Sequence, residues 1–176
     1  RTEEVALKHA PNAEELFWRA CQRYPRLFIA LVSTRRAGTW LMATPEVLVQ
    51  NDMHQWHTMA LAGTMRLTPE QQKWSDEMWN NPTPPLEWSA KNKEEQRLVA
   101  HYIAQCLMHL ADNIEETLPY TQRAGGLVHL RSDFAFTLKP AYGLGDLLQM
   151  LHPTPAVCGL PKAEAWRFII ANEPHR

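Results

Sequence analysis

A run of prolines near the C-terminal end of the sequence restricts the backbone more than any other feature of the chain. Pro153, Pro155 and Pro161 fall within nine positions. Each proline fixes φ and lacks a backbone N–H, so this run cannot be the interior of a helix or a central strand. The residues that precede the prolines are restricted to extended conformations as well. The sequence therefore predicts a stiff, extended segment here.

The residues after Pro161 predict a helix over 162–172, because apolar side chains recur at Ala165, Trp166, Ile169 and Ile170. An extended segment that leads into a helix N-terminus can present backbone N–H groups to an anion. The alternative is a rigid turn before a core helix, and the pattern alone favours that alternative.

Composition excludes several classes of protein. The chain has 176 residues, of which 45% are hydrophobic and 21% charged, with a formal net charge of −1. These values are typical of one globular domain, and we expect a single domain over residues 1–176. The sequence lacks the basic stripe of a nucleic-acid-binding protein and any apolar run of 18 residues that would predict a membrane helix. Three cysteines far apart in the sequence favour a reduced, cytoplasmic protein.

The first third of the chain is predicted to form one helix followed by an antiparallel meander. Asn12 is a candidate N-cap for a core-facing helix over 13–24. Strands are predicted over 27–33 and 39–44, joined by a turn at 36–38, with a short strand over 47–49 and a longer one over 53–62. We expect that longer strand to end in a turn at Gly63 and Thr64.

Helices and one long strand follow. A capping box with proline at the first helical position predicts a short helix from Thr68 to about residue 79. The longest helix begins after Ser89 or Asn92 and runs to about residue 116. Alternation over 127–138 predicts a strand, and a short helix follows near 146–151. Strands and helices come in separate runs, which indicates the α+β class, with antiparallel β-sheets and helices packed outside.

Few residues suggest chemistry by position alone. Glu46 follows a proline at a strand end, where burial would make its carboxyl a general acid, although a solvated rim glutamate is the commoner case. Glu95 lies early in the longest helix, where one carboxylate can help to hold Mg²⁺ or simply face solvent. His129 lies mid-strand among apolar neighbours and is either catalytic or a satisfied core histidine.

Five short motifs in order resemble one family, the chorismate-utilising enzymes, which include isochorismate, salicylate, anthranilate and aminodeoxychorismate synthases. The motifs are Ala-Thr-Pro-Glu at 43–46, Ala-Leu-Ala-Gly-Thr at 60–64, Lys-Asn-Lys-Glu-Glu at 91–95, Val-His-Leu at 128–130, and Leu-His-Pro-Thr-Pro-Ala-Val at 151–157 with Gly-Leu-Pro at 159–161. The second and fifth motifs are most similar to isochorismate synthase. Each motif alone is weak, but their order along nearly the whole chain is specific.

The resemblance implies a fold of the chorismate-binding, anthranilate-synthase type and a reaction. Water would add to C2 of chorismate and the 4-hydroxyl would leave, giving isochorismate. Glu46 would be the general acid for the leaving hydroxyl, and His129 would lie beside that hydroxyl. Glu95 would bind Mg²⁺, which holds the C1 carboxylate.

The remaining implied roles concern binding. Gly63 and Thr64 would approach the substrate carboxylate, and Ala156 and Val157 would line the ring pocket. The resemblance implies chorismate as a small-molecule substrate, with no nucleic acid, membrane or obligatory protein partner.

The sequence also departs from the family. Asn92 replaces an aspartate and Gln96 a histidine of the family pattern, and Cys158 stands where a small residue is common. The family's general base is a lysine that would precede residue 1, and its glycine-rich strands, with a further metal-binding glutamate, would follow residue 176. We therefore expect an internal piece of an isochorismate synthase, inactive or nearly so by itself.

Two alternatives stay open: a non-catalytic chorismate-binding remnant, and a sister enzyme such as salicylate or anthranilate synthase. The product would serve menaquinone or siderophore biosynthesis, and the turn at 60–64 favours menaquinone.

Overall fold

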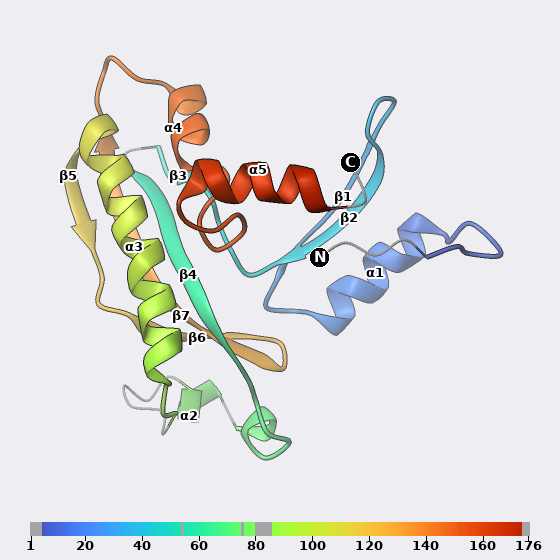
Figure 1. The fold of residues 1–176 in the computed structure, drawn as a ribbon. Coiled ribbons are helices and arrows are strands. Elements are labelled where there is room, and N and C mark those ends of the chain that lie inside the picture. The colour runs from blue at the N-terminus through green and yellow to red at the C-terminus, as the bar shows by residue number, and fades with distance from the viewer. Residues whose placement is uncertain (1–4, 54, 75, 80–85, 174–176) are drawn as a thin grey trace. The chain divides into compact units, whose positions relative to one another are not determined.

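The computed structural model describes residues 5–53, 55–74, 76–79 and 86–173 and divides into two compact units. One unit, Glu46–His152, is called the sheet unit here. The other combines residues up to Pro45 with those from Pro153 onward and is called the hairpin unit. Each unit mixes helices with antiparallel strands, so the predicted α+β class is confirmed (Figure 1). Among the described residues, no helix is long and apolar enough to cross a membrane.

A five-stranded antiparallel sheet forms the frame of the sheet unit. Its strands are ordered β3 (Gln50–Asn51), β4 (Trp56–Arg66), β7 (Leu127–Leu138) and β5 (Ala111–Glu116), and β6 (Tyr120–Ala124) also pairs with β7. Gly125 and Gly126 join β6 to β7, since Ala124 pairs directly with Leu127. The long strands β4 and β7 are neighbours along most of their length, and the candidate residues 63, 64 and 129 lie on them.

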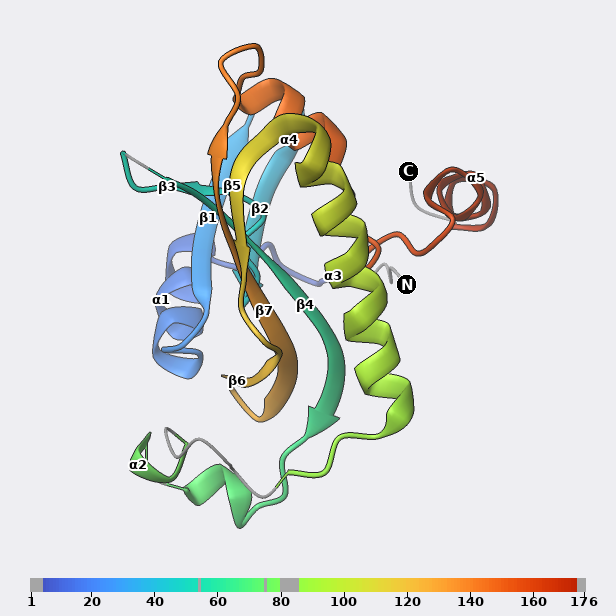
Figure 2. The same cartoon turned by 90° about the vertical axis from the view of Figure 1, so that its left-hand side faces the viewer.

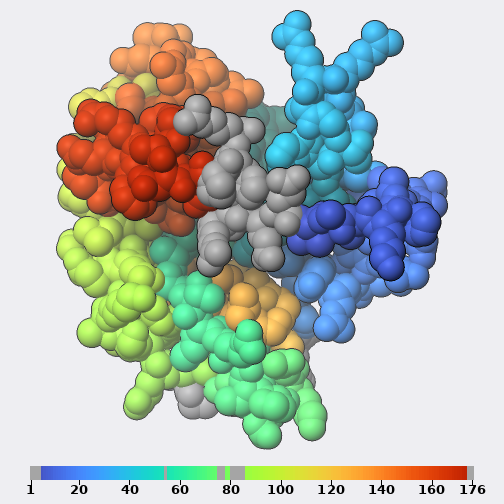
Figure 3. Space-filling model, turned by 45° about the vertical axis from the view of Figure 1, so that its right-hand side comes forward, coloured from blue at the N-terminus to red at the C-terminus, as the bar shows by residue number. Residues whose placement is uncertain are grey.

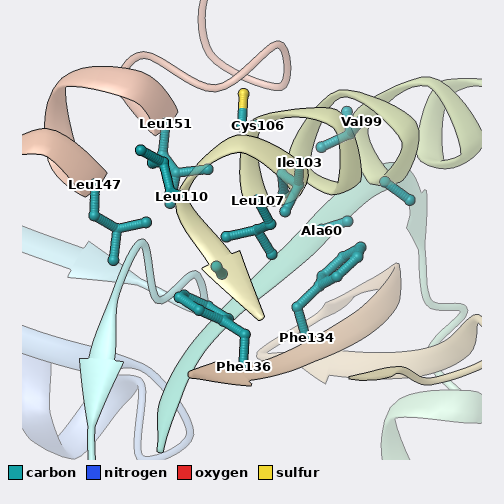
Figure 4. Close-up of a cluster of buried hydrophobic side chains, with 12 residues drawn as sticks. Ala60, Val99, Ile103, Cys106, Leu107, Leu110, Phe134, Phe136, Leu147 and Leu151 are labelled. Carbon is teal, nitrogen blue, oxygen red and sulfur yellow. The ribbon is translucent and has the colours of Figure 1, made fainter. Parts of the chain in front are cut away.

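Helix α3 (Ala90–Leu110) covers one face of this sheet (Figure 2). Side chains of β7 alternate along the strand, and the even-numbered set, which includes Phe134 and Phe136, is buried. Ile103 and Leu107 point from α3 toward these two phenylalanines, and Leu147 and Leu151 of α4 (Leu144–Leu151) close one end of the core (Figure 4). Burying each such side chain stabilises the fold by roughly 1.5–3 kcal/mol.

The hairpin unit contains α1 (Ala13–Arg23), the hairpin of β1 (Phe28–Thr34) and β2 (Gly38–Thr44), and α5 (Lys162–Asn172). Figure 3 shows the hairpin as a slender protrusion with side chains extending from its turn. No residue in these four elements is buried, so the prediction of a core-facing helix over 13–24 is wrong for Leu16, which is 40% exposed. The start of α1 and its Asn12 cap were predicted correctly, and the helix ends one residue before the predicted end.

Other boundaries differ from the predictions. Residues 47–49 are not a strand, and a two-residue strand, β3, forms at Gln50–Asn51 instead. Helix α3 ends at Leu110 and not near 116, because residues 111–116 pair with β7 as an edge strand. Asp and Asn at 112 and 113 are poor helix formers, and Asn113 has φ +52°.

The capping box at Thr68 is present: Gln71 N–H donates to Thr68 Oγ1 at 3.2 Å, and Thr68 N–H donates to Gln71 Oε1 at 2.8 Å. Among the described residues that follow, a 3-10 turn (Gln71–Lys73) and the short helix α2 (Asp76–Trp79) form in place of one helix. Strand β6 was not predicted at all.

Candidate active site

Gly63 forms a bulge in the middle of β4. The register steps from Ala62 opposite Leu130 to Thr64 opposite His129, so Gly63 is an extra residue with no partner on β7. Its φ of +70° lies in the left-handed region, which glycine adopts without steric cost. The strand continues to Arg66, so the predicted strand-ending turn at residues 63–64 is wrong.

The bulge brings Thr64 onto the same side of the sheet as His129. Thr64 Oγ1 lies 3.1 Å from His129 Nδ1, which joins the two neighbouring strands through a side-chain hydrogen bond. Both residues lie on the sheet face opposite α3, because the residues that alternate with His129 on β7 pack into the core. Thr64 is exposed and His129 is half-buried.

Burial lowers the pKa of His129 below its ordinary value of 6.5, and a hydrogen bond with the backbone of Gly63 partly opposes this shift. The imidazole is therefore neutral at neutral pH. A neutral imidazole has one N–H donor and one acceptor nitrogen, so its partners decide which nitrogen carries the proton.

Further along the same face of β7, a polar network surrounds Arg131. Its Nε donates to Asp133 Oδ1 at 2.8 Å, and its Nη1 donates to Gln122 Oε1 at 3.3 Å. Tyr120 O–H donates to Asp133 Oδ2 at 2.7 Å, and burial with this hydrogen bond raises the pKa of Tyr120 to about 12. The charge of Arg131 is thus paired within the sheet.

The N-terminus of α3 lies against the bulge. Ser89 is the N-cap, and its Oγ accepts a hydrogen bond from Asn92 N–H at 3.2 Å. The Asn92 carbonyl oxygen would be only 2.8 Å from a Cβ atom on Gly63. Gly63 therefore allows the first turn of the helix to approach the strand.

Glu95 lies one helical turn farther along α3, where Lys91 Nζ is 3.2 Å from its Oε1. Its neighbour Glu94 accepts two hydrogen bonds from Arg97, each of 2.7 Å. Glu95 is thus the less constrained of the two carboxylates. At the next residue, the Gln96 side chain donates to Ser132 Oγ at 3.0 Å inside the core, so its buried amide has a partner.

The described residues contain no group of three or more His, Cys, Asp or Glu side chains placed to hold a metal ion. Glu95 is the carboxylate that the family resemblance assigns to Mg²⁺, and protein-bound Mg²⁺ commonly takes one or two carboxylates together with substrate oxygens and water. The described side chains alone do not form a complete magnesium site.

Glu46, Ala156 and Val157 lie in other segments of the chain. Glu46 is half-buried in the segment between β2 and β3. Ala156 and Val157 belong to the hairpin unit, where both are exposed. The structure thus brings together Gly63, Thr64 and His129.

The proline segment is a turn, which agrees with the favoured alternative of a rigid turn before a helix and not with an extended segment. The N–H groups of Val157 and Cys158 donate to the carbonyl of Thr154 at 3.1 and 2.9 Å, and Gly159 N–H donates to the carbonyl of Pro155 at 2.9 Å. These N–H groups are used within the turn, so they are not available to an anion. The helix after Pro161 has the predicted bounds.

Sequence reasoning found the residues of the site but missed how they are joined. Nothing in the motif at 60–64 signals an extra residue in the strand, although an Ala-Gly-Thr sequence inside a strand pattern is compatible with a bulge. The Arg131 network was missed as well. Its signal was the spacing of His129, Arg131 and Asp133, which places the three side chains on one face of a strand.

The sequence is similar to those of known proteins. The sequence matches the family described as chorismate binding enzyme over residues 1–176. It is 33% identical to the isochorismate synthase MenF of Pasteurella multocida over 139 residues, covering 78% of this chain and 30% of the relative. It is 34% identical to the salicylate biosynthesis isochorismate synthase of Pseudomonas aeruginosa over 145 residues, which cover 81% of this chain and 29% of the relative.

Solved structures agree in fold. The menaquinone-specific isochorismate synthase MenF of Escherichia coli superposes with a TM-score of 0.76 at 25% identity, covering 93% of this chain and 37% of that one. The putative isochorismate synthase DhbC of Bacillus anthracis gives a TM-score of 0.75 at 23% identity, and the match covers 96% of this chain and 45% of that one. The chain thus spans less than half the length of these proteins, and about three-tenths of the two sequence relatives. The resemblance inferred from the motifs is confirmed: the chain belongs to the family of chorismate-binding enzymes.

Proposed function

We propose that this chain is part of an isochorismate synthase, which converts chorismate to isochorismate by adding water at C2 and expelling the 4-hydroxyl. The observation that carries the proposal is the Thr64–His129 pair at the Gly63 bulge, formed by two of the five ordered family motifs. The names of the relatives, among them isochorismate synthases of menaquinone and salicylate biosynthesis, support the same reaction.

The resemblance to the family gives each residue its proposed role. The Glu46 carboxyl protonates the departing hydroxyl, which then leaves as water. His129 contacts that hydroxyl from the sheet face opposite α3. Gly63 and Thr64 approach the C1 carboxylate, and Ala156 and Val157 line the ring pocket.

Mg²⁺ would neutralise the C1 carboxylate when bound. Within this chain Glu95 is the residue proposed to hold it, as one ligand of a set that the described residues do not complete.

Product identity tests the proposal. The longest natural polypeptide that contains these 176 residues is incubated with chorismate and Mg²⁺, and products are followed by proton NMR. Isochorismate supports the proposal. An aromatic or aminated product would indicate a sister enzyme, and binding without turnover would indicate a non-catalytic chorismate-binding protein.

The Glu46→Gln variant tests the assignment of the acid. It keeps the size of the side chain and removes the proton, so we expect the rate to fall about 10²–10⁴-fold. Glu87→Gln, at an exposed position, is the matched control and should retain the activity.

A further inference from the structure

Two polar side chains meet inside the apolar layer between α3 and the sheet. Gln96 of α3 is 3% exposed, Ser132 of β7 is fully buried, and Gln96 Nε2 donates to Ser132 Oγ at 3.0 Å. Gln96 is the first residue of the buried stripe of α3, whose other members are Val99, Ala100, Ile103, Cys106, Leu107 and Leu110. Gln96 is therefore an amide at the start of a stripe that is otherwise apolar.

Stability does not explain this pair. A buried hydrogen bond gives a small net gain, because the amide and the hydroxyl give up hydrogen bonds to water. Replacing both partners with apolar groups of similar shape is nearly neutral, whereas leaving one partner alone in the core is costly. What the pair adds is direction, since a hydrogen bond forms at one mutual orientation, while apolar side chains repack in several ways.

The pair lies at the end of α3 that carries Glu95, the residue directly before Gln96. One helical turn earlier, the Asn92 carbonyl approaches Gly63 of β4. That backbone contact sets how near the helix lies to the strand, and the directional hydrogen bond to Ser132 sets the rotation of the helix about its axis. A rotation that broke this hydrogen bond would turn the Glu95 side chain as well, because both residues belong to one rigid helix.

We propose that Gln96 is a positioning residue, whose hydrogen bond to Ser132 fixes the rotation of α3 on the sheet and thereby the direction of the Glu95 carboxylate. The part that concerns Glu95 rests on the proposed function, in which this carboxylate holds Mg²⁺. The rotation of α3 is a property of the protein without metal or substrate, so the two parts are tested separately.

The decisive variant is Gln96→Leu with Ser132→Ala, which removes both polar groups and leaves neither alone in the core. Its urea midpoint should stay close to that of the wild type, and the single variant Gln96→Leu should have a lower midpoint. Gln96→Met with Ser132→Ala takes its place if the first pair does not fold. Thr58→Val is the matched control, because it removes another buried hydrogen bond of the sheet unit, from Thr58 Oγ1 to the Leu48 carbonyl at 2.7 Å.

Methyl NMR of the natural full-length polypeptide, labelled at isoleucine, reports the rotation of α3. Ile103 is fully buried and points from α3 toward the sheet (Figure 4), and the signal lost in Ile103→Val identifies it. We expect one Ile103 signal in the wild type and in Thr58→Val, and several signals or a shifted one in the double variant, because cores lose uniqueness before they lose stability. A single signal at the wild-type position in the folded double variant would overturn the proposal.

Calorimetric titration of the same polypeptides with Mg²⁺ in the presence of chorismate tests the effect on Glu95. If the competent rotation is populated to between a third and a tenth, the apparent affinity of the double variant falls about 3–10-fold. Gln96→His should keep the wild-type affinity, because an imidazole N–H can also donate to Ser132. Thr58→Val should keep it as well, and an equal loss there would indicate general loosening of the core and contradict the positioning role.

The two readouts separate the possible failures. Several Ile103 signals with unchanged Mg²⁺ affinity in the double variant would show that the pair does not position Glu95. If the Ile103 result is as expected and the wild-type polypeptide with chorismate binds no Mg²⁺, the proposed metal role of Glu95 fails while the assignment of Gln96 to the rotation of α3 stands.

Discussion

The carbonyl oxygen of Asn92 lies 2.8 Å from the position that a Cβ atom on Gly63 would occupy. The same glycine has a positive φ of +70° and forms the bulge that aligns Thr64 with His129. One residue therefore controls two features of the candidate site: the approach of α3 to β4, and the face to which Thr64 points.

Gly63→Ala should destabilise the sheet unit by about 2–5 kcal/mol. A left-handed conformation costs an alanine roughly 1–2 kcal/mol, and displacing a backbone carbonyl adds about 1–3 kcal/mol. The measurement is native-state hydrogen exchange of the β4 amides. Gly38→Ala is the matched control, because Gly38 has φ +75° with nothing within 4 Å, so its β1–β2 amides should lose only about 1–2 kcal/mol. Equal losses at the two sites would mean that the Asn92 contact contributes nothing.

Phe134→Ala should lower the free energy of unfolding by about 3–5 kcal/mol, because Phe134 is completely buried between β7 and α3. Urea denaturation measures the loss as a lower midpoint at constant slope. Phe168→Ala on α5 is the control, since that ring is 68% exposed, and its effect should stay within about 0.5 kcal/mol. A small effect at Phe134 would contradict the described core.

The pH dependence of stability should report the burial of His129. Its pKa is lower in the folded protein than the ordinary 6.5, so the unfolded state binds the proton more readily. Stability is therefore full above pH 6.5 and falls as the pH drops below 6.5 toward the folded pKa. The charged groups near the ring, Arg131 and Asp133, are paired with each other.

Urea denaturation at pH 7.5 and 5.5 measures this effect. His129→Gln should lose less stability between the two pH values than the wild type does. His101→Gln, exposed on α3, should behave like the wild type. An identical pH dependence in His129→Gln would contradict the burial of the ring.

Mg²⁺ binding should distinguish two neighbouring carboxylates. Glu95→Gln should weaken Mg²⁺ affinity in the presence of chorismate, because the proposed ligand loses its charge. Glu94→Gln should not, since Glu94 is already engaged by two hydrogen bonds from Arg97. Isothermal titration of the natural full-length polypeptide measures both affinities. Equal Mg²⁺ affinity in the two variants would show that Glu95 is not a Mg²⁺ ligand.

Local signals predicted much of the fold. The bounds of β7 and α5 were predicted to the residue, because strict alternation and a helical apolar stripe after Pro161 are strong short-range patterns. The predicted end of α3 was wrong because pairing of residues 111–116 with β7 decides it, and such pairing joins distant parts of the chain. Strand β6 was missed for the same reason.

The candidate site was predictable as a set of residues but not as a geometry. The motifs identified Gly63, Thr64 and His129, and the structure joins them. The bulge depends on the register between β4 and β7, which a single sequence does not encode locally. The roles of all seven candidate residues remain predictions, and these residues are Glu46, Gly63, Thr64, Glu95, His129, Ala156 and Val157.

Turnover of chorismate in water enriched in oxygen-18 tests the central claim most directly. The natural polypeptide that contains this chain is incubated with chorismate and Mg²⁺, and the product is analysed by mass spectrometry and NMR. The account predicts isochorismate with one oxygen-18 atom, in the hydroxyl at C2, because solvent water adds there and the 4-hydroxyl leaves. Isochorismate without the label, or any product other than isochorismate, would contradict it.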